Sequence, residues 1–461
     1  MAREIKPDGD IRFEGFYSYP NSTAFPPDGG VLEYSENMEF NEGVATPRLG
    51  SVLAGTSSAP ITYACGASSS TGDSILLWGT NQRFNCQTGA FTSVNLAAKV
   101  KARGQGYQDA LTMETTDTDF VTGANIVERL VTAKGDKLNF TLYTGIQPYE
   151  PDSAYLVQGT YDSIQAIIPD VNAMLVFGKR SIYSVEGGMG RQANPERKVN
   201  QQVFHKINKV AHQDGLTSKD AVCQLGSTVL FLDTDGIKGI KYSGGKIGYE
   251  DGTPPLTQAI QDIMDLVDQT KLEEITAVSC HGRCFFTLPL NGQYAKSVVL
   301  VFNTYNKVPL ESVYVYPYSI DSVVVGRRDG KPRLWGINKA LGKVYLLNEG
   351  STDAGTAIVA KMRSRNYFFA SHADKKYDDC FLTLDTKGHA EVEMNFISVN
   401  PDGKTLMDKF SGNLGTAVRR ALANKKCMGG KIEIVVKAGR PVIYSIGVEA
   451  SLVGKSIFSS F

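Results

Sequence analysis

A short β unit that recurs along the middle of the chain constrains its fold more than any other feature. Each unit has an apolar strand, a turn with Gly or Asp, and a second strand that ends in an aromatic residue. The clearest copy spans residues 164–187, where the apolar run 174–177 is followed by a break at Gly178 and a strand around Tyr183. Similar units span residues 61–94, 221–244, 277–302 and 321–347. Such a unit cannot bury both of its faces, so neighbouring units must pack together, and we predict a β-propeller with irregular blades.

The composition agrees with an all-β protein. The chain has 461 residues, 42% of them hydrophobic, with 46 Gly, 21 Tyr and 21 Phe and a formal net charge of zero. This length predicts two or three domains. A balanced charge argues against a protein that binds nucleic acid by neutralising phosphates, since each such contact needs a Lys or Arg. The seven cysteines are an odd number spread over a long chain, which predicts buried free thiols rather than a disulfide framework.

The sequence predicts no membrane insertion. The first ten residues, MAREIKPDGD, contain no apolar run and do not resemble a signal peptide. Apolar runs elsewhere stop at about six residues, below the roughly twenty that span a bilayer. We therefore expect synthesis in the cytosol of the producing cell.

Three regions differ in pattern. Residues 1–60 are rich in Pro, Gly and Asn and are expected to form an extended arm that ends in a first strand. Residues 61–347 form the predicted propeller with inserted loops, and residues 350–461 a C-terminal β-sandwich. In the last region the segments 357–369, 381–399 and 431–453 alternate between apolar and polar residues, as expected of sheets with one wet face.

One helix is expected, over residues 256–267. Thr253 is a suitable cap, and Pro254 and Pro255 suit a first turn. One face of the helix would be apolar, and its members are Leu256, Ile260, Ile263, Met264 and Val267. Between two blades, this helix is expected to pack on the propeller flank or to line a subunit interface.

Two segments offer contacts with other molecules. The aromatic tail, with Ile457, Phe458 and Phe461, would be costly to leave in water and is expected to dock on a neighbouring surface. The polar and basic segment 188–215 lies between two blades and is either a partner contact or a solvated loop.

Two motifs resemble metal sites, and a simpler interpretation is favoured for both. The run Asp233-Thr234-Asp235-Gly236 begins like a calcium loop, but Ile237 and Gly239 interrupt the ligand series, so a hairpin turn explains it better. Cys280, His281 and Cys284 suggest zinc. If both cysteines lie on one strand, however, they are about 13 Å apart, too far for one ion, and buried core thiols are favoured.

No catalytic arrangement is apparent among the remaining residues. None of the five histidines lies in an HExxH motif, and no GxSxG element is present. His212 near Asp214 is expected to form a surface pair, and the glycines at 187–190 lack the ending of a phosphate-binding loop. The aspartate boxes of sialidase propellers are missing too. We predict that the protein is not an enzyme and has no catalytic, cofactor-binding or metal-binding residues.

Basic residues gather in three places: 361–365, 375–376 and 419–426. They are expected to form a solvated face, with contact to nucleic acid or to an acidic protein ring as the alternative. Asp374, Asp378 and Asp379 interleave the second cluster and favour the solvated face.

Several stretches resemble the tail nozzle, or tail hub, proteins of short-tailed bacteriophages. The first is the Asn-rich segment 37–50, with Thr46-Pro47-Arg48 and a terminal Gly50. The second is GLTSKDAVCQLGSTVLFLDTDGIKGI at 215–240. The third is the order of the stretches LTQAIQDIMD, VSCHGRCFFTLPL and VVLVFN that follow. The resemblance covers about residues 35–460 as an order of elements.

The resemblance implies a structural virion protein that is synthesised in the host cytoplasm and assembles as a homohexameric ring in the viral tail. The ring would lie below the portal and its adaptor, extend the channel for genome ejection, and dock tail spikes, fibres or a needle. Double-stranded DNA would pass through the lumen without sequence recognition. A basic lumen would retain a duplex that carries one phosphate per about 1.7 Å of axis, so an acidic or polar lumen is expected.

Two alternatives come from other classes. A propeller can be a glycan-binding protein or a glycoside hydrolase, which would need two carboxylates across a sugar in a pocket at the propeller axis. An intracellular scaffold of the host is the other. Ring assembly separates the first interpretation from both alternatives.

Overall fold

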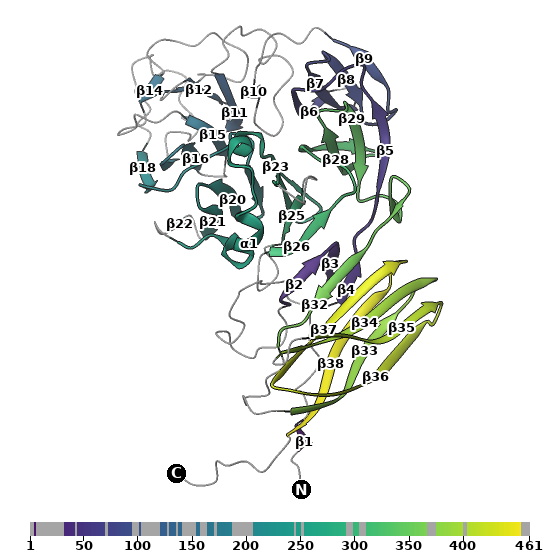
Figure 1. Ribbon diagram of the computed structural model, residues 1–461. Helices are drawn as coiled ribbons and strands as arrows, with labels where there is room; N and C mark the ends of the chain where they lie inside the picture. The colour runs from purple at the N-terminus through teal and green to yellow at the C-terminus, as the bar shows by residue number, and fades with distance from the viewer. Residues whose placement is uncertain are drawn as a thin grey trace, which may run out of the picture.

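The structure is a computed structural model of the chain (Figure 1). It describes residues 4–5, 32–41, 44–69, 72–94, 101–102, 120–126, 129–134, 137–140, 154–156, 164–169, 173–186, 206–243, 246–249, 253–291, 298–303, 310–366, 375–399 and 403–452. The fold is all-β, as predicted, with a propeller at one end and a sandwich at the other.

Six consecutive antiparallel sheets form the propeller in the described part of the chain. The first sheet contains β6 (Tyr63–Ser69), β7 (Gly72–Trp78), β8 (Gln82–Asn85) and β9 (Phe91–Ser93), and the second contains β10 (Lys101–Ala102), β11 (Phe120–Ile126), β12 (Arg129–Lys134), β13 (Lys137–Phe140) and β14 (Ala154–Leu156). The third contains β15 (Ile164–Pro169), β16 (Ala173–Gly178), β17 (Ile182–Glu186) and β18 (Lys206–Ala211). The fourth contains β19 (Val222–Leu225), β20 (Thr228–Asp233), β21 (Gly236–Ser243) and β22 (Lys246–Gly248). The fifth is β23 (Ala277–Cys280), β24 (Arg283–Leu288), β25 (Val298–Phe302) and β26 (Leu310–Val315). The sixth is β27 (Ser322–Arg328), β28 (Lys331–Asn338) and β29 (Lys343–Leu347), joined by β5 (Ser51–Thr56). Among the strands just named, β10 runs parallel to β11 and the other pairs are antiparallel.

Neighbouring sheets bury their faces on one another. One core joins the third and fourth sheets through Phe177 and Phe231. A second joins the fifth and sixth sheets, and a third joins the sixth to the first through Trp335 and Phe84. The sixth sheet takes its outer strand, β5, from the N-terminal part of the chain, so residues from both ends of the propeller complete one blade. This pairing satisfies the outer edge of β29 and ties the segment that precedes the first blade to the sixth.

The sandwich consists of two sheets with long strands. One contains β3 (Met38–Asn41), β4 (Val44–Pro47), β38 (Val442–Leu452), β33 (Lys375–Asp385) and β36 (Thr416–Cys427), with β1 (Glu4–Ile5) on β38. The other contains β2 (Tyr34–Glu36), β32 (Ala360–Arg363), β37 (Gly429–Ala438), β34 (Ala390–Val399) and β35 (Gly403–Gly412). The short hairpin of β30 (Thr352–Asp353) and β31 (Thr356–Ala357) lies between propeller and sandwich.

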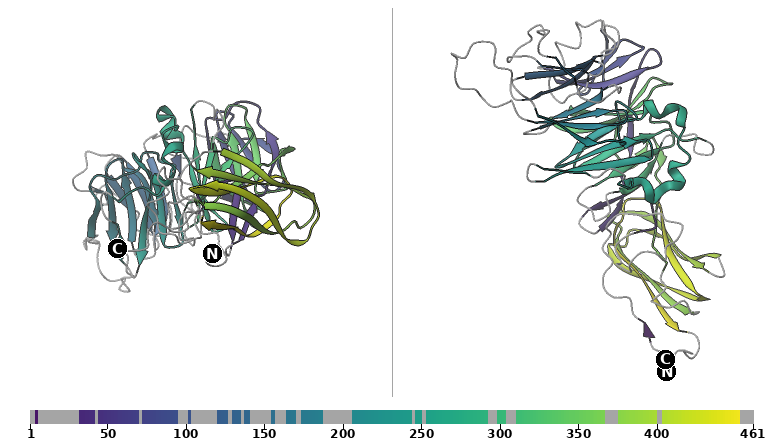
Figure 2. Two further views of the ribbon diagram at one scale, coloured as in Figure 1. Left: turned by 60° about the horizontal axis from the view of Figure 1, so that its bottom comes forward. Right: turned by 90° about the vertical axis from the view of Figure 1, so that its left-hand side faces the viewer.

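A continuous sheet connects the two parts. Strand β2 pairs with β26 of the fifth blade on one side and with β32 of the sandwich on the other. As a result, a nine-stranded sheet runs from the propeller into the sandwich, and the two are stacked end to end in Figure 2. Main-chain hydrogen bonds therefore cross the boundary.

The N-terminal segment differs from the predicted arm where it is described. Residues 34–56 form four strands, β2 to β5, which are divided among three sheets. The sequence pattern missed them because each is short and pairs with a strand that lies about 250 or more residues away, or with a neighbour across a tight turn. Most of residues 1–31 and the tail 453–461 lie outside the described residues.

The predicted helix over 256–267 is shorter and less regular in the structure. A 3-10 turn, η3 (Leu256–Ile260), is followed by the four-residue helix α1 (Gln261–Met264) and by a second 3-10 turn, η4 (Gln269–Glu274). Pro255, rather than Thr253, is the N-cap. Tertiary contacts override the helical pattern: the Thr257 hydroxyl accepts a hydrogen bond from the Ile237 N–H, and Val267 forms a β-bridge with Leu290. In the described residues no helix is long and apolar enough to cross a membrane.

The C-terminal region contains more strands than the three predicted segments. The segment 381–399 is divided between β33 and β34 by a turn at Lys387 and Gly388, both with positive φ. Strands β35 and β36 were not predicted at all. Their outward positions carry Lys, Arg and Asp as well as apolar residues, and this mixture hides the alternation.

Candidate functional site

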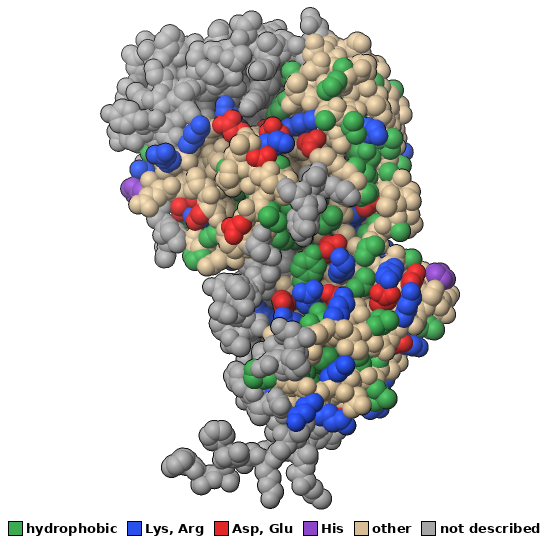
Figure 3. All heavy atoms as spheres, viewed as in Figure 1, with side chains coloured by type: hydrophobic (Ala, Val, Ile, Leu, Met, Phe, Trp, Pro, Cys, Tyr) green, Lys and Arg blue, Asp and Glu red, His purple; other side chains and the backbone are tan. Residues whose placement is uncertain are grey.

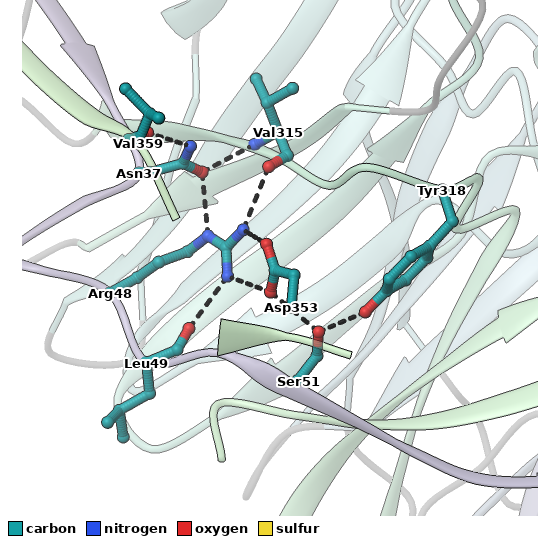
Figure 4. Close-up of polar contacts among 8 residues, drawn as sticks. All are labelled: Asn37, Arg48, Leu49, Ser51, Val315, Tyr318, Asp353 and Val359. Carbon is teal, nitrogen blue, oxygen red and sulfur yellow. Dashed lines mark hydrogen bonds and ion pairs between the residues drawn. The ribbon is translucent and has the colours of Figure 1, made fainter. Parts of the chain in front are cut away.

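The chain passes between sandwich and propeller twice, and a buried arginine binds the two crossings together (Figure 4). Arg48 follows β4 on the first crossing, before β5 enters the propeller. Asp353 lies in β30 on the second crossing, after β29 leaves it. The two side chains are almost completely buried and form an ion pair.

All five N–H donors of the Arg48 guanidinium have acceptors. Nε donates to Asn37 Oδ1 at 2.8 Å. One terminal nitrogen donates to the Leu49 carbonyl at 2.9 Å and to Asp353 Oδ1 at 3.0 Å. The other donates to the Val315 carbonyl at 3.0 Å and to Asp353 Oδ2. A buried arginine is tolerated only with this degree of pairing, so the geometry holds all four acceptor segments in place.

Two aromatic rings beside the guanidinium and two hydroxyl groups beside Asp353 complete the site. The guanidinium lies 4.2 Å from the ring centroid of Tyr316 and 5.4 Å from that of Tyr314. Burial alone would lower the pKa of Arg48, but Tyr316 and Asp353 outweigh it and raise that pKa. Ser51 donates to Asp353 Oδ1 at 2.8 Å and shares a hydrogen bond with Tyr318. The guanidinium therefore stays charged, and these contacts fix its position.

Local backbone geometry at this site depends on Asn37 and Gly50. Asn37 has φ of 56°, a conformation that Asn adopts more readily than most residues, and its amide donates to the Val359 carbonyl at 2.8 Å. A Cβ on Gly50 would lie 2.1 Å from the Thr352 carbonyl oxygen. Glycine is needed there because the two crossing segments are in backbone contact.

A second ionic network lies beside the first, across the same boundary. Arg283 of the propeller pairs with Glu311 at 2.7 Å, and Glu311 accepts a hydrogen bond from the Phe40 N–H at 2.6 Å. Glu39 accepts from Arg440 of the sandwich at 2.9 Å and from the Tyr314 hydroxyl at 3.4 Å. Burial raises the pKa of Glu311, and Arg283 opposes that shift.

The Asp233-Gly236 run is a hairpin turn, as predicted, and a lysine occupies the space between its carboxylates. Lys238 Nζ lies 2.9 Å from Asp233, 2.8 Å from Asp214 and 3.1 Å from Asp235. Burial alone would lower the pKa of Lys238, but hydrogen bonds to Asp214 and Asp233 raise it. Gly236 has φ of 142°, which favours glycine. The carboxylates of this turn thus neutralise a buried ammonium.

The predicted placement of Cys280 and Cys284 on one strand is wrong. Cys280 ends β23, a turn at His281 and Gly282 follows, and Cys284 lies on β24. Both thiols are buried, as predicted, but in different cores. Burial raises the pKa of the Cys280 thiol to about 11.

Only one member of the predicted surface pair of His212 and Asp214 lies at the surface. His212 is exposed, whereas Asp214 is buried against Lys238 and accepts a hydrogen bond from the Tyr249 hydroxyl. The glycines at 187–190 and most of the segment 188–215 lie outside the described residues.

Many members of the three basic clusters form ion pairs. The pairs are Lys361–Glu36, Arg363–Glu433, Lys376–Asp378, Arg419–Asp408 and Arg420–Asp379. Lys375 is buried and donates to the Met428 carbonyl. Among the described residues, no group of three His, Cys, Asp or Glu side chains is placed to hold a metal ion.

Sequence reasoning missed most of the residues at the boundary. It noted the segment 37–50 without giving Arg48 a role, and Glu39, Glu311 and Asp353 were not identified. The available signals in the sequence were Asn37 and Gly50, residue types that often mark unusual backbone conformations or close backbone contacts. The partner of Arg48 is about 300 residues away, and no local pattern marks it.

Comparison with known proteins adds little to these observations. No family model matches the chain, and no curated protein matches it. Among solved structures, an exo-β-1,3-galactanase from Phanerochaete chrysosporium is 9% identical, with 87% of this chain and 99% of that chain covered and a TM-score of 0.30. An arabinoxylan arabinofuranohydrolase from Bacillus subtilis is 7% identical, with 86% and 96% covered and a TM-score of 0.18. Likeness at this level carries no conclusion about function.

Proposed function

We propose that the chain is a structural subunit of the tail nozzle of a short-tailed bacteriophage. In this proposal, copies of the chain form a ring, about six in number, below the portal and its adaptor. The ring extends the genome-ejection channel and docks spikes, fibres or a needle, while double-stranded DNA passes through without sequence recognition. The protein acts in the virion after synthesis in the host cytoplasm, and it has no enzymatic activity.

The boundary around Arg48 carries the proposal. A subunit of a channel wall must keep its shape while neighbours and DNA exert force on it. Here both chain crossings, the strand β2 and two ionic networks hold propeller and sandwich in a fixed relation. Domains joined only by a flexible linker usually move relative to each other, and here main-chain pairing through β2 opposes such motion. The resemblance in the order of elements over residues 35–460 supports the same conclusion.

The state of the buried carboxylates also favours a structural role. Asp353, Glu311 and Glu433 each contact a guanidinium, and Asp214 and Asp233 contact an ammonium. A glycoside hydrolase needs one carboxylic acid that gives up a proton and a second carboxylate across the sugar. Carboxylates held by buried cations are poorly suited to that exchange of protons.

Imaging of the purified protein tests the proposal. Negative-stain images should show closed rings with a central hole, and each contact between copies should bury on the order of 2,000 Å². A glycan array and a set of chromogenic glycosides serve as the competing assay. A monomer that binds or cleaves glycans would replace the nozzle with the carbohydrate function.

A further inference from the structure

The two outer faces of the sandwich carry their charges in different ways. On the sheet that contains β37, Glu433 lies between Lys404 and Arg363, and Glu393 lies between Lys409 and Lys437. Cations and anions alternate across neighbouring strands, and their side chains cover the sheet. This pattern is typical of a solvated face.

The opposite sheet presents apolar side chains to solvent. Val418 and Leu422 of β36 are 66% and 76% exposed, the highest values among the exposed large hydrophobic residues of the described chain. Between them, the Arg420 guanidinium lies 5.5 Å from the ring centroid of Phe381. We call Phe381, Val418, Arg420, Leu422 and Lys426 the β36 face. Exposed apolar residues grouped with cations are typical of a contact surface.

The β36 face is also basic. Strand β36 has no acidic residue, and its Arg420 and Lys426 lie on the same face as Val418 and Leu422. Arg419 lies on the other face of the strand, where it pairs with Asp408. Two carboxylates on the adjacent strand offset part of this charge: Asp379 pairs with Arg420 and Asp378 pairs with Lys376. Three cations on this face, Lys376, Arg420 and Lys426, thus stand against two carboxylates. Lys and Arg side chains gather toward the far end of the sandwich in Figure 3.

The propeller offers a surface of the opposite character. The acidic segment, residues 256–274, comprises η3, α1 and η4 and stands on the propeller flank in Figure 2. It contains one lysine, Lys271, and five acidic residues, which are Asp262, Asp265, Asp268, Glu273 and Glu274. Asp265, Glu273 and Glu274 are exposed. Ile263, Met264 and Leu272 pack against the core and keep part of their apolar surface exposed beside these carboxylates.

We propose that the β36 face of one copy binds the acidic segment of the next copy. The two surfaces are complementary in charge, and each offers apolar side chains for the centre of the contact. Because they are different surfaces of one chain, the contact is head-to-tail and repeats from copy to copy until the ring closes. The inference rests on the proposed ring and names the surfaces that build it.

Exchange of charge between the two surfaces tests this contact. Variant A carries Arg420→Glu and Lys426→Glu, and variant B carries Glu273→Lys and Glu274→Lys. Each variant alone places like charges opposite each other, so its assembly should weaken at least tenfold in a concentration series by light scattering. In an equimolar mixture, every contact between A and B joins opposite charges. The mixture should therefore regain the mass of the wild-type assembly.

Controls separate a failure of this inference from a failure of the ring itself. Arg327→Glu with Lys331→Glu reverses two exposed charges on another hairpin and should leave assembly unchanged. Circular dichroism and thermal unfolding confirm that A and B are folded. If A and B each form the same ring as the wild-type chain, the proposed contact is wrong although the ring remains. The same conclusion follows if both variants are monomeric and their mixture stays monomeric. A monomeric wild-type chain would overturn both.

Discussion

Arg48 and Lys238 are both buried cations held by carboxylates, but they connect very different parts of the chain. Lys238 has three acidic partners within 24 residues of it: Asp233 and Asp235 are in the turn of its own blade, and Asp214 is in the connection that leads into that blade from β18. The partners of Arg48 come from both ends of the propeller and from the segments that enter the sandwich. The first cation stabilises a turn inside one blade, whereas the second joins two domains.

We expect the largest loss of stability from a substitution at Arg48. Arg48→Met leaves Asp353 buried without its cation, and the free energy of unfolding should fall by about 3–5 kcal/mol in urea titrations. Adding Asp353→Leu removes the stranded carboxylate as well and should restore much of the loss. A single variant within about 1 kcal/mol of wild type, by the same titrations, would mean that the ion pair does not hold the boundary.

A smaller and more local effect is expected at Lys238. Lys238→Met should cost about 2–3 kcal/mol, because each carboxylate keeps another partner. Asp214 still accepts from the Tyr249 hydroxyl and Asp233 from the Gly215 N–H, and the exposed Asp235 can turn toward water. Hydrogen exchange should report faster opening in β19 to β22 and unchanged protection in β37. Equal loss of protection in the sandwich would remove the distinction between the two cations.

The pH dependence of the Lys238→Met variant sharpens that distinction. Burial already raises the pKa of Asp233, although Lys238 opposes it, and removal of Lys238 raises it further. A carboxyl whose folded pKa lies above its unfolded value destabilises the fold at neutral pH; this effect declines as the pH falls through the folded pKa and is gone below the unfolded pKa. The deficit relative to wild type should therefore shrink as the pH falls from neutral toward the unfolded pKa of about 4. A deficit that grows on acidification would contradict this assignment.

In the sandwich, Glu433 should contribute stability at neutral pH that acid removes. Burial alone would raise the pKa of Glu433, but Lys404 and Arg363 outweigh it and lower that pKa below its ordinary value of 4.5. Its contribution is fully present above the unfolded pKa and is lost as the pH falls through the folded pKa. Glu433→Gln should cost on the order of 1 kcal/mol at pH 7 and nothing well below pH 4. Thermal unfolding at both pH values measures the difference.

The smallest effect on stability is expected on the β36 face. Leu422→Asn replaces a side chain that is 76% exposed, so the free energy of unfolding should change by no more than about 0.5 kcal/mol. Assembly should nevertheless weaken, since the apolar side chain contributes to the contact between copies. Loss of stability without loss of assembly would assign Leu422 to the fold instead.

The sequence predicted what is local and missed what is distant. The blades, the Asp233-Gly236 turn and the alternating strands of β34 and β37 follow from short periodic patterns. Strands β2 and β5 and the pairing of Arg48 with Asp353 join residues separated by most of the chain, and nothing near either partner indicates the other. The pairing of Lys238 with Asp233 could have been predicted, because the two residues are only five positions apart in the sequence.

Calorimetric unfolding of the wild-type chain tests most directly whether the Arg48 boundary makes propeller and sandwich one rigid body. The account predicts a single transition whose calorimetric enthalpy equals its van't Hoff enthalpy, and two separate transitions for Arg48→Met. Two separate transitions in the wild-type protein would contradict it, because the domains would then unfold independently across an intact boundary.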